Sequence, residues 1–447
     1  MRLAPRTWLA LVTLTLGALP AARAAQVTDV LDAFDGERIW DGALAIRYER
    51  IERRSKILRE WACQSDNALG GTTTASPLCP GGNAVLDTEQ LNFSESLNIL
   101  DIDLRLGLWH DLEFFATVPV IMGWSSELTF ADGVSGANSL VSPVVDDSTS
   151  GGTQILSLFG VPNSSASRVG IGDLVLGFRW QPVNEERDPS MPSWMIGLSY
   201  IAPTGEARTA GGTGVGSAVH ALRIETAISR RFGIVDPYLK LGGTLRFPTS
   251  DGPFKHERTT QTLVSPGHTI DFELGTELYA WRLPSETESY LSIDVALTAG
   301  LTFEGREFTE LFDALGSSGC GPDNNCNETR YARGEKVNGL DRRTDGVTDV
   351  EQYADLGARI GVTYRPMEHF KVKFDFDYAH TTDHFITFAD AGRDLDLDGR
   401  VERRNAANQG VNEYNPFYND HYDSFGKRFR VSDKHTYTIM LMLEGQL

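Results

Sequence analysis

Stretches of 10 to 16 residues in this chain alternate apolar and polar positions with a period of two. In residues 236–248, for example, Leu239 and Leu241 share one face, and Lys240 and Arg246 share the other. Successive side chains of a β-strand point to opposite sides of the sheet, whereas a helix repeats every 3.6 residues. The pattern therefore predicts strands with one apolar and one polar face.

Counting these stretches predicts twelve strands, at residues 38–53, 90–109, 112–124, 169–181, 193–203, 218–231, 236–248, 268–282, 288–304, 350–365, 370–381 and 434–446. Five short linkers lie near His110 and at 182–192, 232–235, 284–287 and 366–369. They alternate with six long ones at 54–89, 125–168, 204–217, 249–267, 305–349 and 382–433. Ten or fourteen strands stay open, because residues 90–109 change phase near Leu100, where a bulge would fit.

A soluble β-sandwich also alternates, and three features favour a membrane barrel instead. The predicted strands exceed the usual five or six residues and match the nine to eleven that cross a bilayer at a tilt. One face is aliphatic and aromatic while the other carries full charges, and short and long linkers alternate. We expect an all-β fold over residues 38–447, a single transmembrane antiparallel up-and-down β-barrel with long extracellular loops and short periplasmic turns.

Aromatic residues gather where the predicted strands meet the short turns. Amphipathic rings favour the headgroup level of a membrane, so we expect them to form the periplasmic girdle of the barrel. The group consists of Trp109, Trp180, Trp194, Phe232, Tyr238, Trp281, Tyr290, Tyr364 and Phe370.

The first 24 residues resemble a cleaved export signal. Arg2 and Arg6 precede an apolar stretch at 7–19 that is too short to span a bilayer, and small residues at positions 22 and 24 fit a cleavage site. Residues 25–37 form a periplasmic leader, in which Val27, Val30, Leu31 and Phe34 have helical spacing. We expect a short helix at or inside the periplasmic mouth, and a protein of the bacterial outer membrane.

Composition excludes several classes of protein. The chain has 447 residues and a net charge of −20, which argues against a nucleic-acid partner because that function requires a clustered basic face. After the N-terminus no apolar run of 18 residues occurs, which argues against membrane-spanning helices. The expected partners are outer-membrane lipid and small solutes, and the oligomeric state is left open.

Four cysteines fall in two local pairs, Cys63 with Cys79 and Cys320 with Cys326. In an exported protein such pairs within Gly- and Ser-rich loops indicate disulfides. A zinc site would require closer pairs or histidine partners. The sequence leaves crossed pairing open.

Charged residues occupy the polar faces of the predicted strands and would therefore line the lumen. Both signs occur, so neighbouring strands can form ion pairs, and two readings stay open: a narrow polar channel that selects solutes, or a salt-bridged plug that stabilises the barrel. The expected lining residues are Arg47, Glu49, Asp101, Asp103, Arg105, Asp173, Arg179, Arg223, Glu225, Lys240, Arg246, Asp271, Glu273, Glu277, Asp294, Arg359, Lys371, Lys373, Asp375 and Asp377.

The last long loop contains the start of a calcium-binding pattern. Asp394, Asp396 and Asp398 supply carboxylates at positions 1, 3 and 5, and Arg400 would supply its carbonyl at position 7. Position 12 is Asn405 instead of the usual bidentate Glu, so we expect modest affinity. A solvated acidic turn is the alternative, and no other cofactor is expected.

Residues 169–248 carry four short motifs in order: Val169-Gly170-Ile171-Gly172-Asp173-Leu174, Ile201-Ala202-Pro203-Thr204-Gly205, Gly211-Gly212-Thr213-Gly214 and Asp236-Pro237-Tyr238-Leu239. Together they resemble the outer-membrane transporter family linked to the meta-pathway of phenol degradation. The resemblance implies an outer-membrane barrel and a role in the passage of hydrophobic or aromatic small molecules.

The functional prediction is a passive route through the outer membrane for small hydrophobic or aromatic molecules. The alternatives are a surface binding or structural barrel with a plugged lumen, or an outer-membrane hydrolase. Ser229, Ser292 and His220 could serve a hydrolase, but no nucleophile elbow surrounds either serine. We therefore expect that the protein is not an enzyme.

Overall fold

The structure is a computed structural model. It describes residues 25–32, 41–63, 84–141, 144–146, 154–156, 158–250, 252–256, 259–282, 289–316, 345–402, 411–419 and 422–446. The expected export signal, the second half of the leader, Asn405 and the cysteines Cys79, Cys320 and Cys326 lie outside these residues. Of Cys63 only the backbone is described, as the last residue of a strand.

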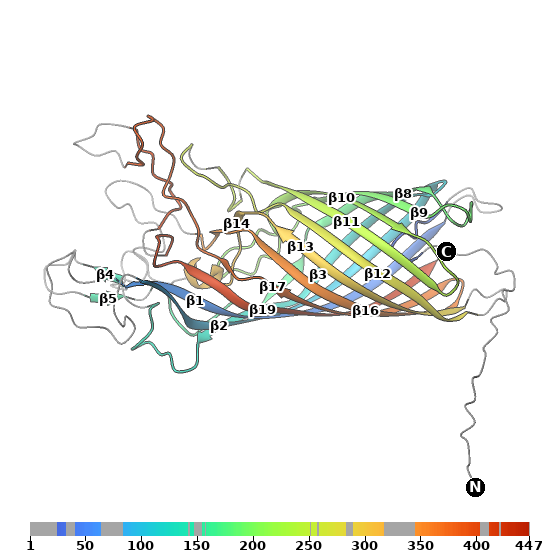
Figure 1. The fold of residues 1–447 in the computed structure, drawn as a ribbon, viewed down its shortest axis with the longest axis horizontal. Helices are drawn as coiled ribbons and strands as arrows, with labels where there is room; N and C mark the ends of the chain where they lie inside the picture. Colours follow the sequence, from blue (N-terminus) through green and yellow to red (C-terminus); the bar gives the residue numbers. More distant parts are fainter. Residues whose placement is uncertain are drawn as a thin grey trace, which may run out of the picture.

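Twelve antiparallel strands form a closed barrel, as the alternation predicts (Figure 1). Each pairs with the next, and the last pairs with the first. The strands are β1 (Gly42–Cys63), β2 (Ala84–Trp109), β3 (Leu112–Phe130), β8 (Leu174–Val183), β9 (Ser193–Ala202), β10 (Val219–Ser229), β11 (Val235–Pro248), β12 (Thr269–Arg282), β13 (Tyr290–Thr302), β16 (Tyr353–Met367), β17 (Phe370–Thr381) and β19 (Phe429–Gln446). No helix of the described chain is long and apolar enough to span a membrane.

Short and long connections alternate as predicted. Asp111, with a φ of 52°, makes the tight turn between β2 and β3, and two residues connect β16 to β17. The start of β1 pairs with the end of β19, so both lie at the rim of the short turns, the right-hand end of Figure 1. Long loops occupy the opposite end.

The outer face of the barrel is a lipid-facing surface. Large apolar side chains point outward from every barrel strand; Leu297 is 63% exposed and Leu274 is 50% exposed. Water would oppose such exposure, whereas the hydrocarbon core of a bilayer favours it. The closed sheet also pairs every strand edge, as a bilayer requires. The protein is therefore an outer-membrane β-barrel.

Most of the expected girdle residues lie on this outer surface. Trp109, Trp180, Trp194, Phe232, Trp281, Tyr364 and Phe370 are exposed, and Tyr290 is half-buried. In β12 the register shifts between Tyr279 and Trp281, and the extra residue turns Trp281 outward. Tyr238 contradicts the prediction, because it is only 4% exposed and points into the lumen.

Four neighbouring strands are much longer than predicted. β1, β2, β3 and β19 have 22, 26, 19 and 18 residues, whereas β8 and β9 have 10 each. The long strands extend toward the extracellular loops, at the left in Figure 1. There their inner faces carry apolar residues that form a buried cluster with the loops, including Ile57, Leu91, Leu128 and Val431.

This cluster also explains the phase change near Leu100. Leu91 and Leu97 face the interior, on the same side of β2 as Asp101 and Asp103. These side chains of β2 all point inward. What changes along the strand is their surroundings, which are apolar near Leu91 and charged near Asp103. The register of β2 and β3 does shift between Asn98 and Ile99, but the extra residue is Met122 on β3. The expected bulge thus lies on the neighbouring strand.

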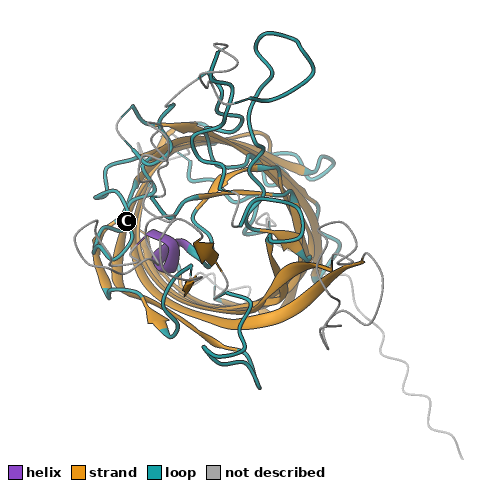
Figure 2. Ribbon diagram, turned by 90° about the vertical axis from the view of Figure 1, so that its left-hand side faces the viewer, coloured by secondary structure: helices purple, strands orange, loops and turns teal. Residues whose placement is uncertain are grey.

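The long loops place further elements within the extracellular half. The loop between β13 and β16 forms the helix α1 (Phe312–Gly316) and the hairpin of β14 (Gly305–Glu307) with β15 (Thr348–Val350). Figure 2 shows the helix inside the outline of the barrel. The small strands β6 (Asn163–Ser164), β7 (Arg168–Ile171) and β18 (His384–Phe385) extend the wall, and β4 (Val144–Asp146) pairs with β5 (Gln154–Leu156).

Candidate functional site

A cavity of about 450 Å³ occupies the periplasmic half of the lumen. It is lined from all sides of the barrel, because the polar face of every strand points inward. Of the residues predicted to face the lumen, Arg47, Asp103, Arg105, Arg179, Arg223, Glu225, Lys240, Glu273, Glu277, Asp294, Arg359, Lys371 and Lys373 line this cavity. We call it the lower cavity.

Several other predicted residues pair with these lining charges. Asp101 and Glu49 lie 2.7 and 3.1 Å from the Arg47 guanidinium. Asp271 accepts two hydrogen bonds from Arg223, at 2.7 and 2.8 Å. Asp375 lies 3.0 Å from Lys373, and Asp377 pairs across the ladder with Arg359 of β16.

The remaining two predicted residues, Asp173 and Arg246, neither line the lower cavity nor pair with the charges that do. Asp173 accepts hydrogen bonds from the backbone N–H groups of Gly205 and Ser217, so it fastens the loop between β9 and β10. Arg246 lies nearer the extracellular end, where its guanidinium is 2.9 Å from Glu307 of β14.

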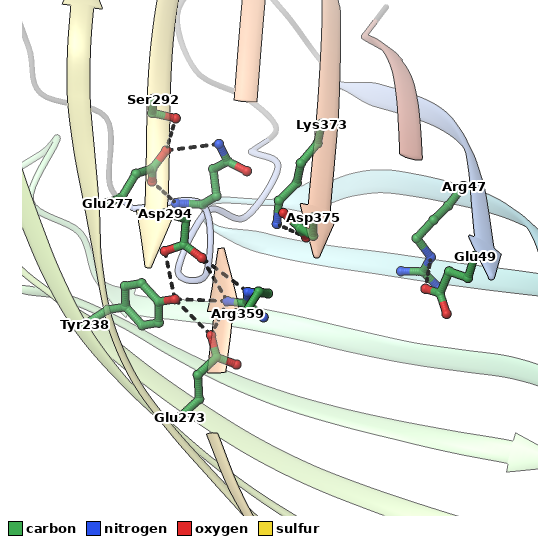
Figure 3. A network of polar contacts seen from close by, with 11 residues as sticks. Arg47, Glu49, Tyr238, Glu273, Glu277, Ser292, Asp294, Arg359, Lys373 and Asp375 are labelled. Carbon is green, nitrogen blue, oxygen red and sulfur yellow. Dashed lines mark hydrogen bonds and ion pairs between the residues drawn. The ribbon is translucent and has the colours of Figure 1, made fainter. Parts of the chain in front are cut away.

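A network around Arg359 joins four consecutive strands (Figure 3). The guanidinium of Arg359 on β16 contacts Glu273 of β12 and donates from Nε to Asp294 of β13, at 3.2 Å. The hydroxyl of Tyr238 on β11 lies 2.9 Å from both carboxylates, either of which can accept its single proton, and it accepts from Arg359. Two carboxylates thus share one guanidinium and one neutral phenol, so each carboxylate has hydrogen-bond partners while the network keeps an excess of negative charge.

A second network lies on the neighbouring part of the wall. Glu225 of β10 is within 3.1 Å of Lys240, and within 3.5 Å of both Arg179 and Arg223. One carboxylate therefore faces three cations, of which Arg223 also pairs with Asp271 and Arg179 also lies 3.6 Å from Glu113. Cations and carboxylates are thus interspersed on this part of the wall.

Residues 25–32 of the leader lie across the periplasmic mouth. The N–H of Gln26 donates to Glu277 of β12 at 3.1 Å, and the N–H of Leu31 donates to Glu113 of β3 at 2.9 Å. Val30 packs against Met195 and Ala227. The segment contains a turn at 26–28 and no helix, so the expected helix is wrong for these eight residues, while their place at the mouth matches the expectation.

Glu113 was not among the predicted site residues. It is fully buried and lies 2.6 Å from Arg105, which also faces Glu444 at 3.6 Å. The polar face of β3 contains this position, so the alternation alone would have included it.

A second cavity, of about 290 Å³, lies in the extracellular half between the wall and the loop elements. We call it the upper cavity. Four carboxylates line it, and each has its own base: Arg53 contacts Glu95, Arg168 lies 2.6 Å from Asp313, Lys434 lies 2.8 Å from Glu310, and Arg246 lies 2.9 Å from Glu307. Its apolar wall includes Phe93, Leu97, Val350, Tyr353 and Ile386.

The acidic loop has the curled shape that the calcium pattern predicts. Carboxylate oxygens of Asp394, Asp396 and Asp398 lie within 4.8 Å of one another. Asp394 accepts hydrogen bonds from the N–H groups of Leu397 and Gly399, whose φ values are 63° and 89°. These three carboxylates converge as a hard cation would require, so the donor set fits calcium.

The three residues considered for a hydrolase are not brought together. The hydroxyl of Ser229 lies 2.8 Å from that of Thr28, and the hydroxyl of Ser292 donates to Glu277. His220 lies at the other end of β10, nine residues from Ser229, and is hydrogen-bonded to Tyr200 of β9.

No model of a known protein family matches the chain, and no curated protein matches it. The resemblance to the phenol-degradation family therefore stays a prediction from the motifs.

Solved structures similar to this one include an outer membrane channel from Pseudomonas putida F1, with a TM-score of 0.38 and 10% identity over 89% of this chain and 95% of that one. A Pseudomonas aeruginosa FadL homologue gives 0.32 and 8%, covering 91% and 90%. The TodX monoaromatic hydrocarbon channel, as a deltaS2 mutant, gives 0.31 and 9%, covering 95% and 92%. These TM-scores lie below 0.5 and assign neither a function nor a substrate to this chain.

Proposed function

We propose that the protein is a channel through which small molecules diffuse passively across the outer membrane. The observation that carries the proposal is the lower cavity, a space of about 450 Å³ enclosed by a membrane-spanning barrel and lined by charged side chains. A barrel of twelve strands is wider than the eight-strand type that side chains fill, and narrower than an open porin. Such a lumen suits single small solutes.

The two cavities lie one above the other along the same strands. Arg47 of the lower cavity and Arg53 of the upper cavity are six residues apart on β1, which corresponds to about 20 Å. A solute from outside would meet aromatic and charged residues first, and then the charged lumen. The path favours molecules with both an apolar ring and a polar group over bare hydrocarbons, because an apolar solute cannot satisfy charged walls.

A specific observation favours the alternative of a plugged structural barrel. Residues 25–32 cross the periplasmic mouth, and α1 lies within the extracellular half. In a channel both segments must move during passage. In a plugged barrel they would stay in place and add to its stability.

Conductance and flux separate these two functions. Purified, folded protein in planar bilayers should give discrete channel events, and liposomes containing it should swell in sugars, amino acids and phenolics at rates that depend on the solute. Liposomes with heat-unfolded protein are the control. Folded protein that gives neither events nor swelling would contradict the channel and favour the plugged barrel.

A further inference from the structure

One cation of the upper cavity is left over after the ion pairs are counted. Each of the four carboxylates that line this cavity has its own base, and none of these bases is Arg208. Within the described part of the chain, the Arg208 guanidinium makes neither a hydrogen bond nor an ion pair. His384 also lines the cavity, but burial lowers its pKa, so it is neutral at pH 7. Arg208 is therefore the one cation lining the cavity that has no carboxylate of its own among the described residues, although Glu95, Asp313 and Glu307 attract it from a greater distance.

Three aromatic rings hold this guanidinium in place. Its central carbon lies 3.8 Å from the ring centre of Phe308, 4.5 Å from that of Trp124 and 5.3 Å from that of Phe312. These rings come from β3 and from the loop that contains α1, while Arg208 comes from the loop between β9 and β10. Ring faces attract the cation but accept none of its in-plane N–H groups as a carboxylate does.

Burial destabilises the charged form of Arg208, which has no anion paired with it. It lowers the pKa of Arg208 to about 9, yet the side chain keeps its proton at neutral pH. A charged guanidinium whose five N–H donors meet no acceptor of the described chain is less stable in such a place than one paired with a carboxylate. An anion that enters the cavity would supply the acceptor.

We propose that the upper cavity binds the monoanion of a small aromatic acid, with its carboxylate on Arg208 and its ring against Phe93, Leu97 and Tyr353. About 290 Å³ lies at the lower limit of ligand-binding cavities, which restricts the ligand to a single ring. The inference names the solute class of the proposed channel, and in that respect it rests on the proposed function. Binding itself can be measured without any flux.

Calorimetry on the folded protein in detergent tests the site, with benzoate as the probe. Benzyl alcohol has the ring without the charge, and acetate has the charge without the ring, so we expect benzoate to bind at least tenfold more tightly than either. Arg208→Gln should weaken benzoate binding tenfold or more, and Arg208→Lys should weaken it less. Arg230→Gln is the matched control, since Arg230 is exposed at a periplasmic turn.

Two outcomes would overturn the site. One is wild-type protein that binds benzoate no more tightly than benzyl alcohol or acetate, a comparison that needs no variant to fold. The other is a folded Arg208→Gln protein with unchanged benzoate affinity. Either of these outcomes, together with liposomes that swell in other solutes, would overturn the site and leave the channel in place. Benzoate binding without any flux would support the site and contradict the channel.

Discussion

The ring of Tyr238 on β11 lies across Gly275, the residue directly opposite on β12. A Cβ atom built on Gly275 would be 2.4 Å from both the hydroxyl oxygen and the carbon that carries it. Only a glycine leaves room for the ring, so this glycine allows Tyr238 to reach Glu273 and Asp294 from a neighbouring strand. The parity of β11 points Tyr238 into the lumen, on the same face as Lys240, and Gly275 leaves the space that its ring occupies there.

Substitution of Gly275 should show how much this arrangement stabilises the barrel. Gly275→Ala must displace Tyr238, and we expect a loss of about 1–3 kcal/mol, as for other overpacked sites. The midpoint of urea unfolding, followed by the gel shift of the folded barrel, measures the change. Gly243→Ala is the matched control, because its added Cβ would meet only one atom, at 3.8 Å. Equal midpoints for the two variants would refute the role of Gly275.

The leader should limit conductance if the lumen is a path. Val30 is 7% exposed and packs against Met195 and Ala227, so Val30→Asp would bury an unpaired charge, which is costly enough to expel the segment. We expect single-channel conductance to rise severalfold. Val411→Asp, at an exposed position in the last long loop, should leave it unchanged. Identical conductance in wild type and Val30→Asp would exclude residues 25–32 as a barrier.

The acidic loop should bind calcium with modest affinity. Three convergent carboxylates without a bidentate Glu correspond to the weak range of about 0.1–1 mM found in extracellular calcium modules. Calorimetry with calcium chloride should give a binding heat that is lost in Asp396→Ala. Asp132→Ala removes an exposed carboxylate from another loop and should bind as wild type does. The absence of heat in the wild type would favour the solvated acidic turn.

Two buried carboxylates in the extracellular loops should make the packing of these loops depend on pH. Burial raises the pKa of Asp349 on β15 to about 6, in spite of Arg306 at 3.2 Å, and it also raises the pKa of Asp423. In the pH range between the ordinary and the raised values, the packed state binds more protons than the released state. The packing is therefore most stable at low pH and weakens as the pH rises through about 6, by about 3 kcal/mol for Asp349.

The open fraction of the channel in planar bilayers should consequently increase from pH 5 to pH 8. Asp423→Asn, which cannot ionise, should reduce this dependence, and Asp132→Asn should keep it. An open fraction that falls with pH would show that the loops respond to other groups.

The sequence predicted the number and order of the barrel strands because one rule, alternation between lipid and lumen, applies to each of them. It underestimated the lengths of β1, β2, β3 and β19, because these strands continue beyond the membrane, where the alternation between lipid and lumen no longer applies. Beyond the membrane Leu91 faces a packed loop instead of water, while Ile102 faces lipid, so the apolar side of β2 reverses along one strand. A pattern read along the chain cannot reveal what covers a strand.

The candidate sites divide in the same way. The charges of the lower cavity follow from strand parity, and most of them lie where the alternation places them. Arg208 was not predicted, because its surroundings combine Trp124, Phe308 and Phe312 from distant parts of the chain. No motif in the sequence around Arg208 indicates which distant residues will surround it. Tyr238 was misplaced because it was grouped with the aromatic residues near the short turns, although it shares the lumen face of β11 with Lys240.

If the barrel is the proposed channel, the chain segments at both ends of its lumen would act as two gates in series. The leader and the α1 loop are separate parts, and nothing requires them to yield together. A solute small enough to fit the lumen between the two segments would enter when one segment moves and leave when the other moves. Transport would then proceed in single portions, and its rate would saturate with concentration even though no energy is spent.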